Sequence, residues 1–191
     1  MGNETRKRML QTTLRLIQLR GLHGVSLNDI LEESGSPRGS LYFHFPGGKE
    51  ALVAEAMQSG IEEASQVLRE CLASASHPAD GVKAFFQAAA EEMTRSDYGF
   101  GCPVAPIILD SPHVSTKLAA ACRAAIDEWT EMYREALLAG GLSFERAGRV
   151  ANTITASLEG ALIMARSHQD ATLIVTVGDE VADLITLAVN R

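Results

Sequence analysis

The 191-residue sequence lacks any uninterrupted apolar run near the roughly eighteen residues that a membrane-spanning helix needs. No signal peptide is expected before its charged start, ETRKR. Cysteine is scarce, with Cys71, Cys102 and Cys122 as its three occurrences, an odd number without metal-ligand spacing. These absences argue against a membrane protein and a disulfide-rich secreted domain. They favour a cytoplasmic protein with three reduced, buried thiols.

Signals of catalysis are also sparse. The histidines form no pair at metal-ligand spacing on one helix, and no phosphate-binding glycine loop occurs; they are His23, His44, His77, His113 and His168. Ser111 and His113 lie together in DSPH, but no nucleophile elbow surrounds them. We therefore expect no enzyme, cofactor or metal site. A hydrolase that uses Ser111 and His113 is the weaker alternative.

What the chain does contain is an ordinary globular composition with an uneven charge. Apolar residues make up 46% and charged residues 21%. The length of 191 residues suits one or two domains and allows about 70% of the unfolded surface to be buried. The net charge is −7, yet residues 1–50 carry +2 and residues 51–191 carry −9. A basic end on an acidic remainder suits a protein that meets phosphate through one face.

Helical periodicity runs through almost the whole sequence and predicts an all-α fold of about nine helices. A first helix is expected to end near Gly21, a long one to cover residues 50–75, and another to open at Pro78. The β-branched segment 172–177 resembles a strand, but no other segment offers a strand to pair with it. We therefore predict a helix there too.

Residues 26–49, SLNDILEESGSPRGSLYFHFPGGK, predict two short helices around a glycine turn. Ser26 can cap the first helix, with Asp29 completing a capping box. Gly35 suits the left-handed conformation that ends this helix. Ser36 is predicted to cap the second helix, with Pro37 at its first position.

The second of these helices has one inward face and one outward face. Leu41 and Phe45, four residues apart, are predicted to point inward. The remaining side chains lie on the outer surface: Arg38, Gly39, Ser40, Tyr42, Phe43 and His44. Two short helices set at an angle by a glycine turn form a helix-turn-helix, whose second helix enters the major groove of DNA. A helix-turn-helix that binds protein partners, in an adaptor or architectural protein, is the alternative.

This front end, the Y-x-H-F-x-x-x-K pattern from Tyr42 to Lys49 and the helical, acidic remainder resemble the TetR family of transcriptional regulators. Within it, SPRGSLYFHFPGGKEAL and GFGCPVAP are similar to the LmrA/YxaF-type branch. The resemblance implies a DNA-binding domain over residues 1–47 and a ligand-binding and dimerisation domain over residues 48–191. It also implies a homodimeric repressor that leaves a near-palindromic operator when a small apolar or aromatic effector, flavonoid-like or drug-like, binds.

The resemblance also assigns functional residues. Base-edge contacts go to Arg38, Gly39 and Ser40, and backbone contacts to Tyr42, His44 and Lys49. The full DNA-binding set is Ser26, Arg38, Gly39, Ser40, Tyr42, Phe43, His44 and Lys49. Arginine can pair with guanine through two hydrogen bonds, whereas tyrosine, histidine and lysine suit phosphate oxygens.

Two further sets and a hinge complete the predictions. The expected effector pocket comprises Phe86, Met93, Tyr98, Phe100, Trp129, Tyr133, Asn152 and Thr155. The expected dimer interface comprises Ala151, Leu158, Ala161, Leu162, Ala165, Val181, Leu184 and Ile185. For both sets, packing in the core of a single chain is the alternative. Gly47 and Gly48 are predicted to form a hinge, so that Gly48→Ala would alter induction more than stability.

Overall fold

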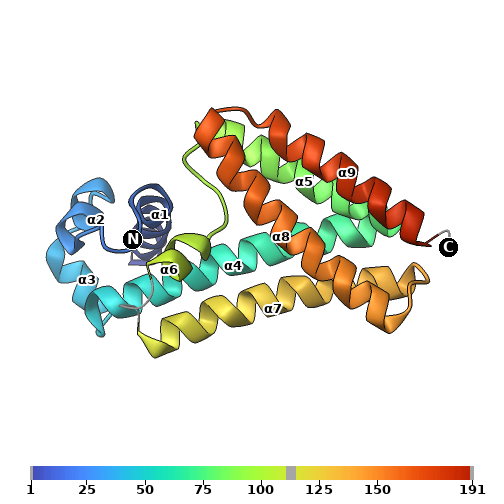
Figure 1. Cartoon of the computed structure of the whole chain (residues 1–191). Helices are drawn as coiled ribbons and strands as arrows, with labels where there is room; N and C mark the ends of the chain where they lie inside the picture. Colours follow the sequence, from blue (N-terminus) through green and yellow to red (C-terminus); the bar gives the residue numbers. More distant parts are fainter. Residues whose placement is uncertain (1, 111–114, 190–191) are drawn as a thin grey trace. The chain divides into compact units, whose positions relative to one another are not determined.

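The computed structural model describes residues 2–110 and 115–189, and every regular element in these ranges is an α-helix (Figure 1). The helices are α1 (Gly2–Arg20), α2 (Leu27–Glu33), α3 (Arg38–His44), α4 (Gly48–Ser74), α5 (Pro78–Arg95), α6 (Ala105–Leu109), α7 (Thr116–Ala139), α8 (Phe144–His168) and α9 (Thr172–Val189). The all-α prediction with about nine helices is confirmed, and the segment 172–177 is helical. Within the described ranges, no helix is long and apolar enough to cross a membrane.

The chain divides into two compact units. The first unit contains residues 1–63 and 102–122, and the second contains residues 64–101 and 123–191. The division falls inside α4 and α7, so each of these long helices contributes residues to both units. The boundary that the sequence places at residue 47 is not tested by this division and stays a prediction.

The first unit has a core drawn from α1 to α4 and α6. Its fully buried side chains include Met9, Leu16, Ile17, Ile30, Leu41, Phe45, Leu52 and Val104. Gly60 lies where α4 packs against α1, and a Cβ atom there would lie 2.8 Å from Cδ2 at the far end of the Leu14 side chain. This core holds α2 and α3 through Ile30, Leu41 and Phe45, and leaves their other faces exposed.

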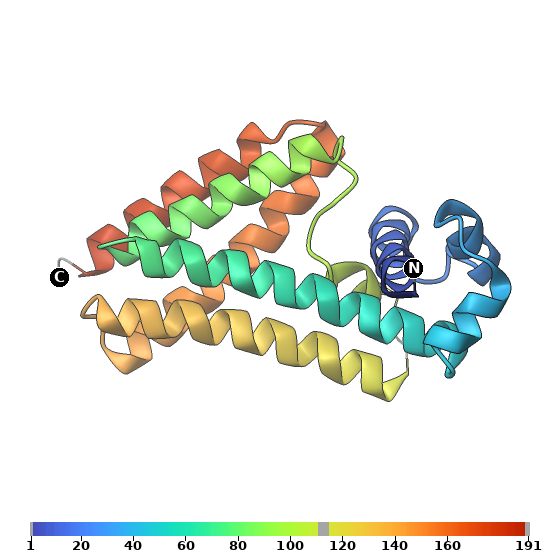
Figure 2. The ribbon, with the colours of Figure 1, turned by 180° about the vertical axis from the view of Figure 1, so that it is seen from behind.

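The second unit is built around α5, α8 and α9, with parts of α4 and α7. Helices α5 and α9 lie side by side, as both ribbon views show (Figures 1 and 2). Gly178 permits this contact, since a Cβ atom there would lie 2.6 Å from Cβ of Phe86. Phe86 is fully buried, and Leu68, Met93 and Tyr133 are also in the core.

The cysteines are all free thiols, but they are not equally buried. Cys102 and Cys122 are buried, whereas Cys71 is half-buried on α4. The prediction of three buried thiols is therefore wrong for Cys71, because that turn of α4 is only partly covered. Burial raises the pKa of both Cys71 and Cys122, which disfavours the thiolate form.

Candidate nucleic-acid interface

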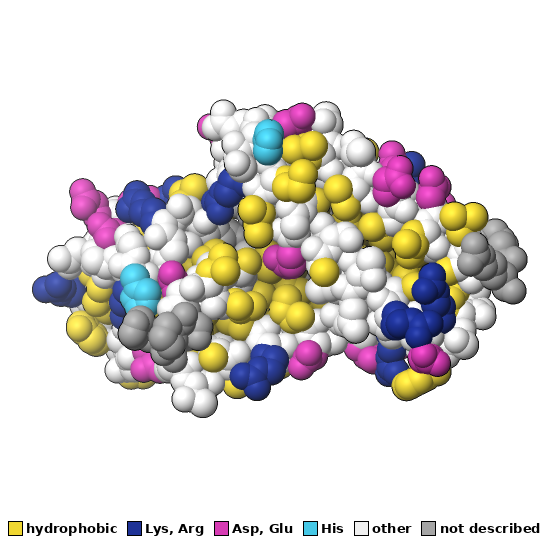
Figure 3. Space-filling model, in the orientation of Figure 1, with side chains coloured by type: hydrophobic (Ala, Val, Ile, Leu, Met, Phe, Trp, Pro, Cys, Tyr) yellow, Lys and Arg dark blue, Asp and Glu magenta, His cyan; other side chains and the backbone are white. Residues whose placement is uncertain are grey.

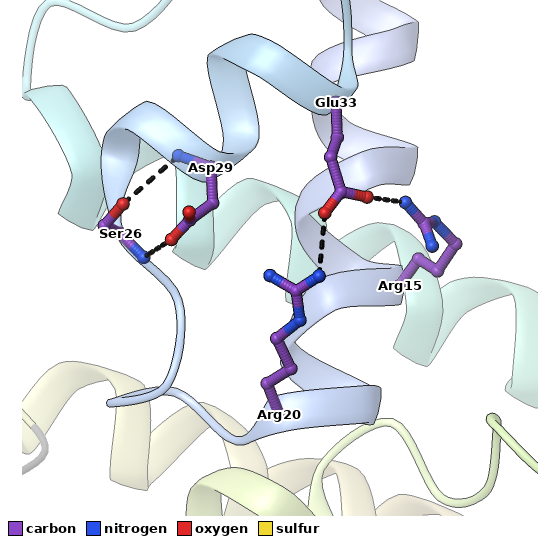
Figure 4. A network of polar contacts seen from close by, with 5 residues as sticks. All are labelled: Arg15, Arg20, Ser26, Asp29 and Glu33. Carbon is purple, nitrogen blue, oxygen red and sulfur yellow. Dashed lines mark hydrogen bonds and ion pairs between the residues drawn. The ribbon is translucent and has the colours of Figure 1, made fainter.

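The start of α2 carries the predicted capping box (Figure 4). The hydroxyl of Ser26 accepts a hydrogen bond from the backbone N–H of Asp29 at 3.1 Å, and the Asp29 carboxylate accepts one from the backbone N–H of Ser26 at 2.7 Å. These hydrogen bonds lower the pKa of Asp29 below its ordinary value. Two orphan donors at the helix start are thereby satisfied, which fixes where α2 begins.

Ion pairs connect α1 to the end of α2 (Figure 4). Glu33 accepts hydrogen bonds from Arg15 and from Arg20, the latter at 2.9 Å. Because all three side chains are partly exposed, each pair adds little to stability on its own. Two arginines on one carboxylate nevertheless restrain the orientation of α2 against α1.

The turn between α2 and α3 was predicted correctly at Gly35 and wrongly at the start of α3. Gly35 has a φ of 60°, the left-handed conformation expected of it. Pro37, with a ψ of 145°, is the N-cap, and the helix begins at Arg38. The Ser36 hydroxyl donates to the backbone carbonyl of Ser34 instead of capping α3. The extended backbone at Pro37 therefore delays the helix by one residue.

The side chains of α3 divide into an inward and an outward set, as predicted. Leu41 and the adjoining Phe45 are fully buried. In contrast, Tyr42 is 57% exposed and Phe43 is 81% exposed. Folding gains little from an aromatic side chain left in water. This exposure leaves both rings free to contact a partner molecule.

Arg38 lies at the first turn of α3 and is exposed. Its guanidinium donates a hydrogen bond to Oδ1 of Asn28 on α2, at 2.9 Å. A guanidinium has five N–H donors, so this bond orients Arg38 and leaves donors for another acceptor. No pattern in the sequence points to Asn28, since the contact joins residues on two different helices.

Lys49 and Gly48 lie at the start of α4. Lys49 is half-buried, and its ammonium group donates to the backbone carbonyl of Val25, next to the capping box. Gly48 has a φ of 66°, so an alanine there would be strained. Contrary to the sequence-based expectation, we therefore expect Gly48→Ala to lower stability. That variant does not test the hinge.

His44, also in the predicted set, is half-buried at the end of α3. Its ring meets the Phe43 ring edge to face, with centroids 4.9 Å apart. Gly39 is exposed and Ser40 half-buried. A Cβ atom at Gly39 would meet no atom within 4 Å, so the helix surface is open there.

The predicted pocket residues differ in burial within the second unit. Phe86, Met93, Trp129 and Tyr133 are buried, Tyr98, Phe100 and Thr155 are half-buried, and Asn152 is exposed. Two polar groups already have partners inside the unit. The indole N–H of Trp129 donates to the Ser65 hydroxyl at 2.8 Å, and the hydroxyls of Thr155 and Thr130 are hydrogen-bonded at 3.0 Å.

The predicted dimer residues mostly face the interior of the second unit. Buried within the single chain are Ala151, Ala161, Leu162, Ala165, Val181 and Ile185, while Leu158 is half-buried and Leu184 is exposed. Other apolar side chains of α8 and α9 are exposed, with Ile163 at 61% and Leu187 at 64%. Figure 3 shows hydrophobic side chains gathered over α8. The predicted dimer set did not include Ile163 or Leu187, because helical periodicity defines the faces of a helix but not which face its neighbours cover.

Within residues 2–110 and 115–189, no group of three or more His, Cys, Asp and Glu side chains could hold a metal ion. Ser111 and His113, the pair in the alternative hydrolase hypothesis, lie outside the described residues.

Comparison with known proteins identifies the family. A model of the "Transcriptional regulator LmrA/YxaF-like, C-terminal domain" matches residues 78–180, and a model of "Bacterial regulatory proteins, tetR family" matches residues 9–56. The HTH-type transcriptional regulator LmrA of Bacillus subtilis is 33% identical over 95% of this chain and 97% of its own length. The chain belongs to the TetR family. It is a DNA-binding transcriptional regulator, and the relatives it matches are regulators rather than enzymes.

Other TetR-family regulators are also similar to this chain. YxaF of Bacillus subtilis, an uncharacterised HTH-type regulator, is 27% identical, with 95% of each chain covered. A TetR regulator from Chloroflexus aurantiacus has a TM-score of 0.83 and 29% identity, covering 97% of this chain and 96% of its own. The regulator CifR has a TM-score of 0.78 and 21% identity, covering 93% of this chain and 94% of its own. A cysteine mutant of CifR was solved with 26-bp double-strand operator DNA.

Proposed function

We propose that this TetR-family protein represses transcription by placing α3 in the major groove of an operator. The observation that carries this is the division of α3, which anchors Leu41 and Phe45 in the core while Tyr42 and Phe43 stand exposed. Arg38, Gly39 and Ser40 would reach base edges, with Asn28 orienting the guanidinium of Arg38. Tyr42, Phe43, His44, Lys49 and the exposed Ser26 would contact the sugar-phosphate backbone.

Lys49 would act in two ways at this surface. Its ammonium group holds the carbonyl of Val25, which precedes the capping box of α2. It also adds positive charge near the N-terminus of α4, where the helix dipole already favours an anion. The same residue would therefore position α2 and attract a phosphate.

The proposed assembly is a homodimer formed through α8 and α9. The exposed side chains Ile163, Met164, Leu184 and Leu187 offer apolar surface that a second copy would cover. In a dimer, the two recognition helices would read half-sites about 34–36 Å apart, one turn of DNA. A near-palindromic operator follows from that two-fold symmetry.

An oligomerisation assay tests the dimer. Light scattering of the purified protein at micromolar concentration should give the mass of two chains. Ile163→Glu should shift it toward one chain and weaken operator binding, since a buried carboxylate is costly. Leu109→Glu, an exposed apolar site on α6, is the matched control and should stay dimeric. A monomeric wild type would contradict the proposal.

Release would follow binding of a small apolar or aromatic effector, flavonoid-like or drug-like, in the second unit. The buried Phe86, Met93, Trp129 and Tyr133 supply flat and polarisable surface suited to such a molecule. The effector must prefer a conformation that binds DNA less well. A helix-turn-helix adaptor without an effector remains the second candidate, and it predicts no response to any ligand.

The experiment is selection of bound fragments from random duplex DNA, followed by release with aromatic compounds.

A second experiment tests the phosphate contact of Lys49. Lys49→Gln removes the charge but keeps an N–H donor for Val25, and should lower the slope of log affinity against log salt by about 0.9. Lys49→Ala should lower it equally and also lose the Val25 contact. Lys83→Ala is the control, because Lys83 pairs with Asp179 in the second unit. An unchanged slope for Lys49→Gln would remove the phosphate assignment.

A further inference from the structure

Tyr133 on α7 carries a buried hydroxyl in the second unit. It is only 1% exposed, and its hydroxyl has no hydrogen-bond partner among the described residues. Nearly all buried polar atoms in folded proteins are hydrogen-bonded, because an unpartnered one opposes folding. An orphan hydroxyl therefore calls for an explanation.

Trp129 and Thr130, one turn before Tyr133 on α7, already have hydrogen-bond partners of their own. Ser65 accepts from the indole of Trp129, one turn before Tyr133 on the same helix. The hydroxyls of Thr130 and Thr155 are hydrogen-bonded to each other. The Tyr133 hydroxyl, in contrast, has no partner among the described residues, which leaves its donor for a molecule that enters.

The surroundings of Tyr133 come from four helices of this unit. The ring of Phe85 on α5 meets the Tyr133 ring edge to face, with centroids 6.5 Å apart. Burial raises the pKa of the Tyr133 phenol, and its electrostatic interactions with Cys71 on α4 and Glu159 on α8 raise it further. The phenol therefore stays neutral and carries an O–H donor at ordinary pH.

We propose that the Tyr133 hydroxyl donates a hydrogen bond to the effector and selects for one that bears an uncharged acceptor oxygen, such as a carbonyl. This inference rests on the proposed function, because it names the chemistry of the ligand that releases DNA. The rings of Phe85 and Trp129 favour an aromatic skeleton. The carboxylate of Glu159 disfavours an anion, and a carbonyl accepts a hydrogen bond without bringing charge.

Matched ligands that differ only in the acceptor test this directly. Xanthone and 9-fluorenone carry a carbonyl, whereas xanthene and fluorene have a methylene in its place. Binding is followed by quenching of Trp129, the single tryptophan of the chain. The wild type should bind each ketone more tightly than its hydrocarbon. Tyr133→Phe should reduce this preference about fivefold, the loss of one hydrogen bond, with hydrocarbon affinity unchanged.

The free protein supplies a second measurement. Phenylalanine keeps the ring and removes only the unpartnered hydroxyl, so the Tm of Tyr133→Phe should equal or exceed that of the wild type. Thr153→Val is the matched control, since the Thr153 hydroxyl already bonds the carbonyl of Arg149 on its own helix. It should leave the ketone preference unchanged.

Operator binding separates failure of this inference from failure of the proposed function. If the wild type binds a selected operator, three results overturn the inference alone: no binding of either ketone, an equal ketone preference in wild type and Tyr133→Phe, or a lower Tm in Tyr133→Phe. Absence of operator binding by the wild type would overturn the proposed function itself.

Discussion

Helices α3 and α7 use aromatic side chains in opposite ways. The short α3 exposes Tyr42 and Phe43, whereas α7 buries Trp129 and Tyr133. The surface of α3 is made by neighbours in sequence on one small helix. The surroundings of Tyr133 come from α4, α5, α7 and α8. A surface function can therefore be read from a local motif, while an interior one becomes visible only when the chain is folded.

The largest expected effect is on the free energy of unfolding, which should fall far more for a substitution in α7 than for one in α3. Trp129→Ala should lower the free energy of unfolding by about 3–5 kcal/mol, because it removes a buried ring and leaves Ser65 without its donor. Phe43→Ala should change it by less than about 0.5 kcal/mol. Urea denaturation measures both. Similar losses in the two variants would show that the Phe43 ring is packed rather than free.

A smaller effect tests how tightly the second unit is packed. Gly178→Ala should cost about 1–3 kcal/mol, because the added methyl would overlap Phe86. Gly148→Ala, on α8, meets nothing within 4 Å and should stabilise the helix by about 0.5–1 kcal/mol. Thermal unfolding of the pair gives the sign of each change. A stable Gly178→Ala variant would show that α5 and α9 can separate freely.

The smallest effect compares helix caps in the two units. Ser26→Ala should cost about 1 kcal/mol, since it breaks a reciprocal capping box with bonds of 2.7 and 3.1 Å. Ser143→Ala should cost less, because Ser143 makes a single 3.4 Å bond to the N–H of Arg146. Chemical denaturation at neutral pH measures the loss of unfolding free energy in each variant. The reverse order would contradict the role given to the box.

Acid should weaken the Ser26 cap as well. The folded-state pKa of Asp29 is lowered, so the stability it contributes is present above its ordinary value near 3.8. That contribution is lost as the pH falls through the folded-state value. Asp29→Asn should therefore flatten the acid limb of the stability profile relative to wild type. If stability falls with acid equally in wild type and Asp29→Asn, then Asp29 does not contribute to acid unfolding.

What the sequence predicted follows from how local each feature is. The capping box and the turn at Gly35 depend on residues a few positions apart, and both are confirmed. The start of α3 was misplaced because Pro37 can either begin a helix or precede it. The contacts of Arg38 with Asn28 and of Lys49 with Val25 join separate elements. The spacing of residues along the chain does not predict such contacts.

In the second unit, the faces of α8 likewise show that contacts between separate helices are hard to predict from sequence. Its small residues, such as Ala151 and Ala165, suggested a subunit interface but are buried in the single chain. Ile163 and Met164 lie exposed on the same helix. Helical period shows that two faces differ, yet only the neighbouring helices decide which one is covered.

The central claim is that α3 reads a DNA sequence through Arg38. The direct measurement is the affinity of wild type and Arg38→Ala for a selected duplex and for its scrambled counterpart, at one fixed salt concentration. The wild type should prefer the selected duplex by about a thousandfold or more, and Arg38→Ala should lose about 1–3 kcal/mol of that preference. Equal affinity of the wild type for both duplexes would contradict the account.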